Sequence, residues 1–238
     1  MTQFPESVSR FVRESPIYRR PIARSVATFA RSIPIGTKVL DAGAGDSPYK
    51  PLFAHCQYVS QDWTESAHPG ASRADIVADL AELPVPDREF GAILCTEVLE
   101  HVADPEKVCG ELFRVIRPGG DLLLTVPFVI ELHEAPYDFY RYTSYGLVGL
   151  LEGAGFGQVC VDPLSGCFST LGAVMRNAHG TLGTGAFASR FAGAVSWGLS
   201  ELFRVAAPKL DRLDERRLLP TGWVVSAKRP SMNLDEGA

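Results

Sequence analysis

The sequence predicts an α/β protein with a Rossmann-like, doubly wound sheet of mostly parallel strands and helices on both faces. Short apolar runs rich in Val, Ile and Leu alternate with segments of helical periodicity, which is typical of βαβ units. Distinctive polar residues follow several of these runs, and parallel sheets bind ligands where the carboxyl ends of their strands meet loops. The 238 residues are enough for one elaborated domain with its own core.

The N-terminal region precedes the first expected strand. Residues 4–33 carry two amphipathic stripes and predict one or two helices, which Pro16 and Pro21 separate. We treat residues 1–36 as a helical cap. The stretch from Arg10 to Arg31 is rich in arginine, and it is either a solvated helix face or a contact for an acidic partner such as a phosphorylated substrate or an anionic membrane surface.

The expected strands are apolar runs bounded by turn residues. In chain order they are residues 38–42, 57–61, 75–78, 91–96, 121–126, 158–162 and 222–228. A helix between the fourth and fifth strands is expected to bury Val115 and Ile116 and to end at residues 118–120. Residues 144–152 predict another helix, with Thr143 as its N-cap.

Residues 168–207 interrupt this alternation. They are rich in Gly and Ala with interspersed aromatic residues, and they predict two helices inserted before the last strand. The insertion either covers the acceptor site or forms a subunit contact, so a homodimer through 168–207 or the N-terminal helices is possible. The main domain is expected to span 37–230, followed by a flexible tail over 231–238.

Composition and charge exclude several classes of protein. The formal net charge of −5 argues against nucleic-acid binding. No cluster of His, Cys, Asp or Glu has metal-ligand spacing, so no metal is expected. The five cysteines form no CxxC pair and the N-terminus has no apolar signal core, which favours the cytoplasm. No apolar stretch is long enough for a transmembrane segment.

The first expected strand ends in a glycine loop that runs from Asp41 to Pro48. Its glycines let the backbone approach a small ligand closely, and Asp41 favours a ligand amino group. A nicotinamide-binding fingerprint would need a third glycine where Pro48 stands, and no GK[ST] sequence is present for a phosphate-binding loop. The loop therefore predicts a ligand that is positively charged at this point and lacks phosphates.

Two further carboxylates follow neighbouring strands. Asp62 can accept hydrogen bonds from both hydroxyls of a ribose. Asp79 can accept one from the exocyclic amine of adenine, with Leu80 packing on the ring. Together the three strand ends describe an adenosine that carries an amino acid.

Residues 38–127 resemble the cofactor-binding half of class I S-adenosylmethionine-dependent methyltransferases of the broad "type 11" kind. The resemblance is carried by VLDAGAG, by the strand end at Asp62, by ADLAELPVPDREFGAILCTEVLEHV and by RVIRPGGDLLLTVP. It implies S-adenosyl-L-methionine as cofactor and a seven-stranded sheet whose last strand, residues 222–228, runs antiparallel. Gln61 before Asp62 and the Asp-Ser-Pro after Gly45 depart from the family pattern.

The resemblance also implies a set of cofactor-binding residues, one group for each part of the molecule. The methionine end is assigned to Asp41, Gly43, Ala44 and Gly45, the ribose to Asp62 and Trp63, the adenine to Asp79 and Leu80, and the sulfonium side to Thr96 and Glu97.

The acceptor-side loop, residues 128–142, follows the fifth strand and is rich in polar aromatic residues. We expect His133 to act as the base, because its ordinary pKa lies near neutrality. Tyr140 is a further catalytic candidate, and Arg141 can clamp a carboxylate or phosphate of the acceptor. In the alternative, Arg141 pairs with an acid of the loop and only ties the loop down.

The leading hypothesis is methyl transfer from S-adenosylmethionine to an O or N atom of a small-molecule acceptor. The HExPxDFxRYT pattern of the loop resembles methyltransferases of sugar and polysaccharide pathways. Two alternatives remain open at this point. One is a catalytically silent, methyltransferase-like binding protein, and the other is a nucleotide-dependent oxidoreductase, which Pro48 disfavours.

Overall fold

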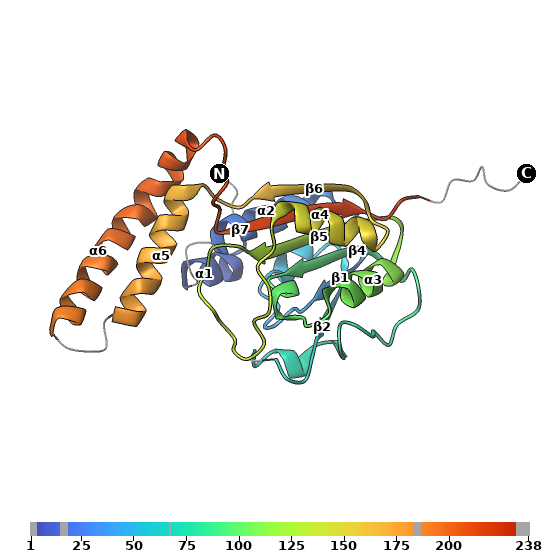
Figure 1. Ribbon diagram of the computed structural model, residues 1–238. Coiled ribbons are helices and arrows are strands. Elements are labelled where there is room, and N and C mark those ends of the chain that lie inside the picture. The colour runs from blue at the N-terminus through green and yellow to red at the C-terminus, as the bar shows by residue number, and fades with distance from the viewer. Residues whose placement is uncertain (1–3, 15–18, 67, 183–186, 232–238) are drawn as a thin grey trace, which may run out of the picture.

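The structure is a computed structural model that describes residues 4–14, 19–66, 68–182 and 187–231 (Figure 1). Its centre is a seven-stranded sheet of order β3-β2-β1-β4-β5-β7-β6. β7 runs antiparallel to β5 and β6, and the other pairs are parallel, as predicted. The strands are β1 (Lys38–Ala42), β2 (Gln57–Asp62), β3 (Ile76–Val77), β4 (Phe90–Thr96), β5 (Ile116–Pro127), β6 (Gly157–Pro163) and β7 (Gly222–Lys228).

Helices cover both faces of the sheet. The α-helices are α1 (Glu6–Glu14), α2 (Arg19–Ser32), α3 (Pro105–Val115), α4 (Ser144–Gly153), α5 (Cys167–Leu182) and α6 (Phe187–Leu210). The 3-10 turns are η1 (Lys50–Phe53), η2 (Ala71–Arg73), η3 (Leu99–His101) and η4 (Asp211–Leu213). As expected, Thr143 caps α4, because its hydroxyl accepts a hydrogen bond from the N–H of Gly146.

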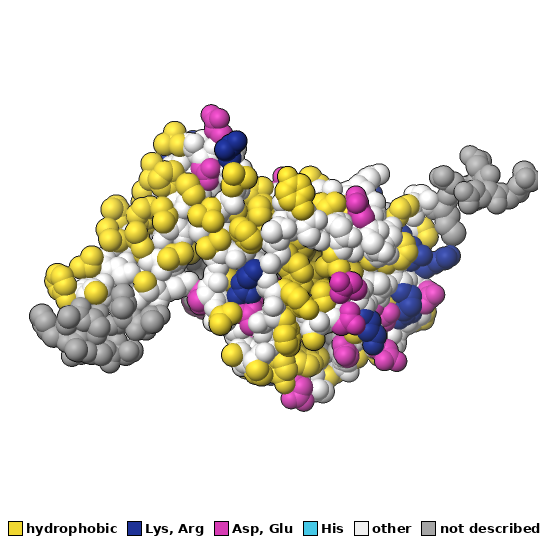
Figure 2. All heavy atoms as spheres, in the orientation of Figure 1, with side chains coloured by type: hydrophobic (Ala, Val, Ile, Leu, Met, Phe, Trp, Pro, Cys, Tyr) yellow, Lys and Arg dark blue, Asp and Glu magenta, His cyan; other side chains and the backbone are white. Residues whose placement is uncertain are grey.

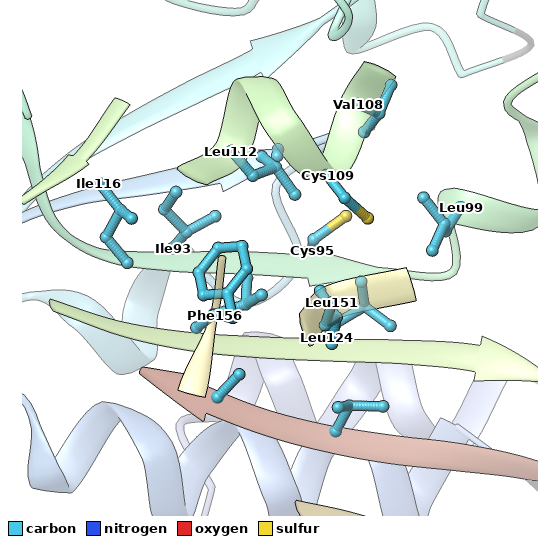
Figure 3. Packing of buried hydrophobic residues seen from close by; sticks show 14 of the residues in the cluster. Ile93, Cys95, Leu99, Val108, Cys109, Leu112, Ile116, Leu124, Leu151 and Phe156 are labelled. Carbon is cyan, nitrogen blue, oxygen red and sulfur yellow. The ribbon is translucent and has the colours of Figure 1, made fainter. Parts of the chain in front are cut away.

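Two apolar cores flank the sheet. One lies between the sheet and α3 with α4, and the other lies beneath α2. Figure 3 shows the first core, where Leu99 inserts beside Cys95 and Cys109. Leu99 is fully buried, so it anchors the η3 turn that leaves the end of β4.

The strand order reverses between β1 and β4. β1 pairs with β2 on one side and with β4 on the other, and their carboxyl ends lie at one edge of the sheet. Loops that leave such a switch point in opposite directions open a crevice there. The predicted cofactor residues lie at or just after the strand ends on this edge, which we call the carboxyl edge.

Two local expectations were wrong. Pro21 does not separate helices, because it lies in the first turn of α2, where a missing N–H costs no hydrogen bond. Pro16 lies outside the described residues. Ile116 was expected to lie in the helix. However, α3 stops at Val115, and Ile116 already pairs with Phe90 as the first residue of β5.

The α5–α6 hairpin lies between β6 and β7 in the chain and projects from the end of the sheet (Figure 1). Hydrophobic side chains spread over its surface (Figure 2), and Phe191, Leu202 and Val205 are each more than 60% exposed. Within the described residues, no helix combines the length and apolar character needed to cross a membrane. The domain boundaries drawn from the sequence remain predictions, and most of the 231–238 tail lies outside the described residues.

Candidate active site

The glycine loop after β1 is fixed by the end of β2. The N–H of Gly43 donates to Oε1 of Gln61 at 3.1 Å, and the N–H of Gly45 donates to Oδ2 of Asp62 at 2.7 Å. Both glycines have positive φ, +70° and +54°, which side chains rarely tolerate. A Cβ on Gly43 would also lie 2.3 Å from Cγ2 of Val98. Conformation and close packing therefore both require glycine at the first of these positions.

Asp41 is the last residue but one of β1 and is 2% exposed. Burial raises its pKa to about 7, the hydroxyl of Tyr58 donates to it and opposes this rise, and the charge of Asp62 adds to it. A ligand ammonium beside these carboxyls would favour the ionised form. Ala44 contributes its backbone, since its N–H donates to the carbonyl of Gln61 at 2.8 Å.

Asp62 is held at the end of β2 with unused acceptor capacity. Its carboxylate accepts the N–H of Gly45 at 2.7 Å and that of Trp63 at 2.8 Å. A carboxylate offers about four lone-pair sites, so roughly two remain for the hydroxyls of a ribose. The surplus fits the assignment of Asp62 to a sugar diol.

The adenine assignment rests on a short turn after β3. Asp79 is exposed, and its Oδ1 accepts the N–H of Ala81 at 2.9 Å. Leu80 is 6% exposed and packs in the core beneath. Asp79 therefore offers a free oxygen to a ligand, whereas Leu80 chiefly anchors the turn.

The end of β4 places Thr96 and Glu97 at the same edge. Glu97 has φ +55°, and its Oε1 accepts the hydroxyl of Thr125 at 2.9 Å. Burial raises the pKa of Glu97, and the positive charge of Arg19 on α2 opposes the rise. Arg19 was not among the predicted site residues, and the arginine-rich stretch was the only sequence feature that pointed to it.

The acceptor-side loop is tied to the η3 turn by backbone and hydroxyl contacts. The N–H of Phe139 donates to the carbonyl of Glu100 at 2.8 Å. The hydroxyl of Tyr140 donates to the carbonyl of Ala103 at 3.1 Å, and that of Tyr142 donates to the carbonyl of Leu99 at 3.0 Å. The loop thus lies directly over the turn that follows β4.

Arg141 is engaged within the loop. Its guanidinium donates to both carboxylate oxygens of Asp138, at 2.6 and 2.8 Å, and to the carbonyls of Tyr140 and Glu131. The hydrogen bonds from Arg141 lower the pKa of Asp138 to about 2. This geometry favours the tying role over that of an acceptor clamp.

Two contacts close the loop over the carboxyl edge. Nε2 of His68 lies 3.5 Å from a carboxylate oxygen of Glu134, and the rings of Trp63 and Tyr137 meet edge to face at 5.2 Å. Each contact joins the segment after β2 to the acceptor-side loop. The two contacts place the loop that holds His133 across the carboxyl edge.

His133 lies in a cluster that sequence spacing did not reveal. Its Nε2 is 3.9 Å from Oε1 of Glu100, and Nε2 of His101 is 3.7 Å from the same oxygen. Glu100 is fully buried, and neither of its carboxylate oxygens has a hydrogen-bond partner. Burial and the nearby charge of Glu97 raise the pKa of Glu100 well above its ordinary value.

Three comparisons with known proteins agree with this geometry. A family model described as "Methyltransferase domain" matches residues 40–124. A protein of Mycolicibacterium smegmatis named "Probable S-adenosylmethionine-dependent methyltransferase" is 32% identical over 193 residues, which cover 75% of this chain and 74% of the relative. The 27-O-demethylrifamycin SV methyltransferase of Amycolatopsis mediterranei is 31% identical over 159 residues, 58% of each chain.

Among solved structures, the phosphoethanolamine N-methyltransferase 2 of Haemonchus contortus, in complex with phosphomonomethylethanolamine and S-adenosylhomocysteine, superposes with a TM-score of 0.56. The match covers 88% of this chain and 52% of the other at 16% identity, so it shows the shared fold. The relationship to the mycobacterial relative is much stronger, at 32% identity over three quarters of this chain. This chain therefore belongs to the S-adenosylmethionine-dependent methyltransferases, with S-adenosylmethionine as its cofactor.

Proposed function

We propose that the chain methylates an oxygen or nitrogen atom of a small-molecule acceptor held between the carboxyl edge and the acceptor-side loop. The observation that carries this proposal is the position of that loop, which is tied onto η3 and closes over the edge through His68–Glu134 and Trp63–Tyr137. A closed site of this kind suits a small acceptor better than a long polymer. Family membership leaves no support for the oxidoreductase alternative.

The cofactor assignments are part of the proposal. Asp41 and the glycine loop would hold the methionine end, Asp62 and Trp63 the ribose, and Asp79 the adenine amine. Thr96 and Glu97 would line the sulfonium. The buried, poorly compensated carboxyl of Asp41 and the spare acceptor capacity of Asp62 support these roles.

Bound S-adenosylmethionine supplies an electrophilic methyl group on a good leaving group. The chain's own residues then have to orient the acceptor, exclude water and take the acceptor's proton. His133 is the base that we propose, since it is partly exposed on the inner side of the loop. Tyr140 and Arg141 are bound to backbone and to Asp138, so their proposed part is to position the loop.

The proposal also names the class of acceptor. The names of relatives include a rifamycin O-methyltransferase and a structural neighbour that is an N-methyltransferase for phosphoethanolamine, which supports O or N as the acceptor atom. We place sugars and secondary metabolites with free hydroxyls first. Homodimerisation through 168–207 or the N-terminal helices remains a prediction, and the exposed apolar side chains of α6 favour the former.

The test is methyl transfer from labelled cofactor to fractions of a small-molecule extract and to a panel of hydroxylated sugars. We expect a labelled small molecule and stoichiometric S-adenosylhomocysteine. Transfer to nitrogen or oxygen is read from the product by mass spectrometry and NMR. Label found only on RNA or protein would contradict the proposal, and cofactor binding without any transfer would favour the silent binding protein.

A further inference from the structure

One cluster at the acceptor side has chemistry that methyl transfer does not require. It joins Glu100 and His101 of η3 to His133 of the acceptor-side loop, and one ligand atom from each lies within 4.8 Å of the other two. The Nε2 atoms of His101 and His133 lie 3.7 and 3.9 Å from Oε1 of Glu100. These separations are too long for hydrogen bonds. In a tetrahedral metal site with bonds of about 2.0–2.1 Å, two neighbouring ligand atoms lie ~3.3 Å apart. The two N–O distances here exceed that value by only a few tenths of an ångström.

Glu100 supplies the charge for a cation. Its side chain is fully buried, and both carboxylate oxygens lack a hydrogen-bond partner. A buried carboxylate without partners is costly, so native proteins pair such groups or place a metal beside them. The Nε2 atoms of both imidazoles lie within 4 Å of Oε1 of this carboxylate.

The histidines are oriented as metal ligands are. Nδ1 of His101 lies 2.6 Å from the carbonyl of Tyr137, which can only accept, so Nδ1 carries the proton and Nε2 keeps its lone pair. Nδ1 of His133 lies 3.3 Å from the carbonyl of Glu131 and 3.5 Å both from a carboxylate oxygen of Asp138 and from Nη2 of Arg141. Metal-binding histidines are held in this way by a second acceptor behind the ring.

We propose that Glu100, His101 and His133 bind a divalent first-row transition metal such as Zn²⁺. Two imidazoles and one carboxylate suit Zn²⁺, Fe²⁺ or Ni²⁺ and leave coordination positions open. Glu134 lies nearby, with an oxygen 4.0 Å from Nε2 of His101, and is a candidate fourth ligand. In the metal-loaded protein His133 is a ligand, so its role as a base belongs to the metal-free protein.

The test uses the full chain, stripped with a chelator and titrated with Co²⁺ and Zn²⁺. We expect one ion per chain, and bound Co²⁺ should show ligand-field absorption without thiolate charge-transfer bands. Glu100→Gln and His133→Ala should each weaken Zn²⁺ binding by more than about 100-fold. Cys160→Ser and His55→Gln are matched controls and should bind as the wild type does. Absence of saturable one-to-one binding, or unchanged affinity in Glu100→Gln and His133→Ala, would overturn the proposal.

Folding and cofactor binding are followed in the same samples. Glu100→Gln replaces a buried carboxyl with an amide of the same size, so we expect it to fold, and Zn²⁺ should raise the Tm of the wild type but not of this variant. S-adenosylhomocysteine affinity should be unchanged in Glu100→Gln. A protein that binds the cofactor and methylates an acceptor yet binds no metal overturns the metal site alone. A protein that binds Zn²⁺ at these residues without methyl transfer overturns only the proposed function.

Discussion

The carboxyl edge and the acceptor-side loop meet at one end of the sheet, but their carboxylates have different hydrogen-bond partners. At the edge, Asp62 is satisfied by backbone N–H groups of the loops around it. On the acceptor side, Glu100 is buried with no hydrogen-bond partner for its carboxylate, and two imidazoles lie within 4 Å of one of its oxygens. The edge is thus built from backbone and can hold a fixed ligand, whereas the acceptor side is built from side chains whose protonation or metal content can change.

The same contrast is visible in two aspartates. Burial raises the pKa of Asp41 at the edge to about 7, while Arg141 lowers the pKa of Asp138 in the loop to about 2. Within the part of the chain that the structure describes, the neighbours that shift the first carboxyl are Tyr58 and Asp62, whereas the second is paired with Arg141. A cationic ligand would therefore stabilise the ionised form of Asp41, whereas Asp138 is already paired with Arg141. The following variants test this difference.

His133→Ala should have the largest effect, and only on turnover. Loss of a general base, or of a metal ligand at the same atom, should lower kcat by about 100-fold or more. S-adenosylhomocysteine affinity should stay within twofold of the wild type, as measured by calorimetry. The matched control is His55→Ala, since His55 precedes β2 at the opposite end of the sheet. A wild-type rate across the pH range would remove His133 from the chemistry.

Asp62→Ala should weaken binding of the cofactor, whereas His133→Ala should affect only turnover. Losing charge-assisted hydrogen bonds to a ribose should weaken S-adenosylhomocysteine binding by about 10- to 100-fold. Asp121→Ala is the control, because Asp121 pairs with Lys228 at 2.8 Å near the other end of β5. Unchanged affinity in the folded Asp62 variant would refute the ribose assignment.

Gly43→Ala tests whether the edge depends on backbone conformation. The positive φ and the contact with Val98 should together lower the free energy of unfolding by about 2 kcal/mol. Adding Val98→Ala should recover the packing part but not the conformational part. Gly149→Ala, on an exposed face of α4 with open space around it, should instead stabilise by about 0.5–1 kcal/mol. Urea denaturation measures all three, and an unaffected Gly43 variant would show that the loop can relax.

Asp41→Asn should change the pH dependence of stability. The raised pKa of Asp41 means that the folded chain keeps a proton that the unfolded chain releases above about pH 4. Its contribution to the free energy of unfolding therefore falls as pH rises from about 4 to 7. Relative to the wild type, the Asn variant should gain at least about 1 kcal/mol over that window. Parallel curves for the two proteins would show that Asp41 is ionised without a ligand.

Asp138→Asn should show the opposite sign and the smallest effect. The lowered pKa of Asp138 stabilises the folded chain above about pH 4, and this contribution is lost as pH falls towards 2. The wild type should exceed the variant by about 1 kcal/mol at neutral pH, with the difference shrinking in acid. Thermal unfolding across pH 2–7 measures it. A difference that is constant with pH would indicate lost packing rather than lost charge.

Much of the fold was predictable because its signals are local. Each of the seven strands overlaps its predicted apolar run, although β5 begins at Ile116 rather than at residue 121, and the cap at Thr143 was identified from one residue type before a helix. The errors had local causes as well. Pro21 was taken as a break although the first turn of a helix accepts proline, and Ile116 continued the apolar periodicity of α3 into a strand.

Part of the candidate site was likewise predictable from local patterns, and part was not. Asp41, Asp62 and Asp79 were predicted as cofactor residues because each lies at or just after the end of its own strand, and parallel strands bring their carboxyl ends together. On the acceptor side, Glu97 has a positive φ, and a short 3-10 turn rather than a longer helix follows it. That turn instead directs Glu100 into the interior, which no spacing rule foresees.

The sequence by itself determined the sheet and the cofactor, because those properties follow from short contiguous patterns. Only the tertiary structure decided which side chains meet on the acceptor side. Glu100 and His133 come from segments separated by α3 and β5, and their encounter depends on how the loop packs over η3. A contact between distant segments is fixed by packing of the whole chain, so the cluster of Glu100, His101 and His133 could be recognised only in three dimensions.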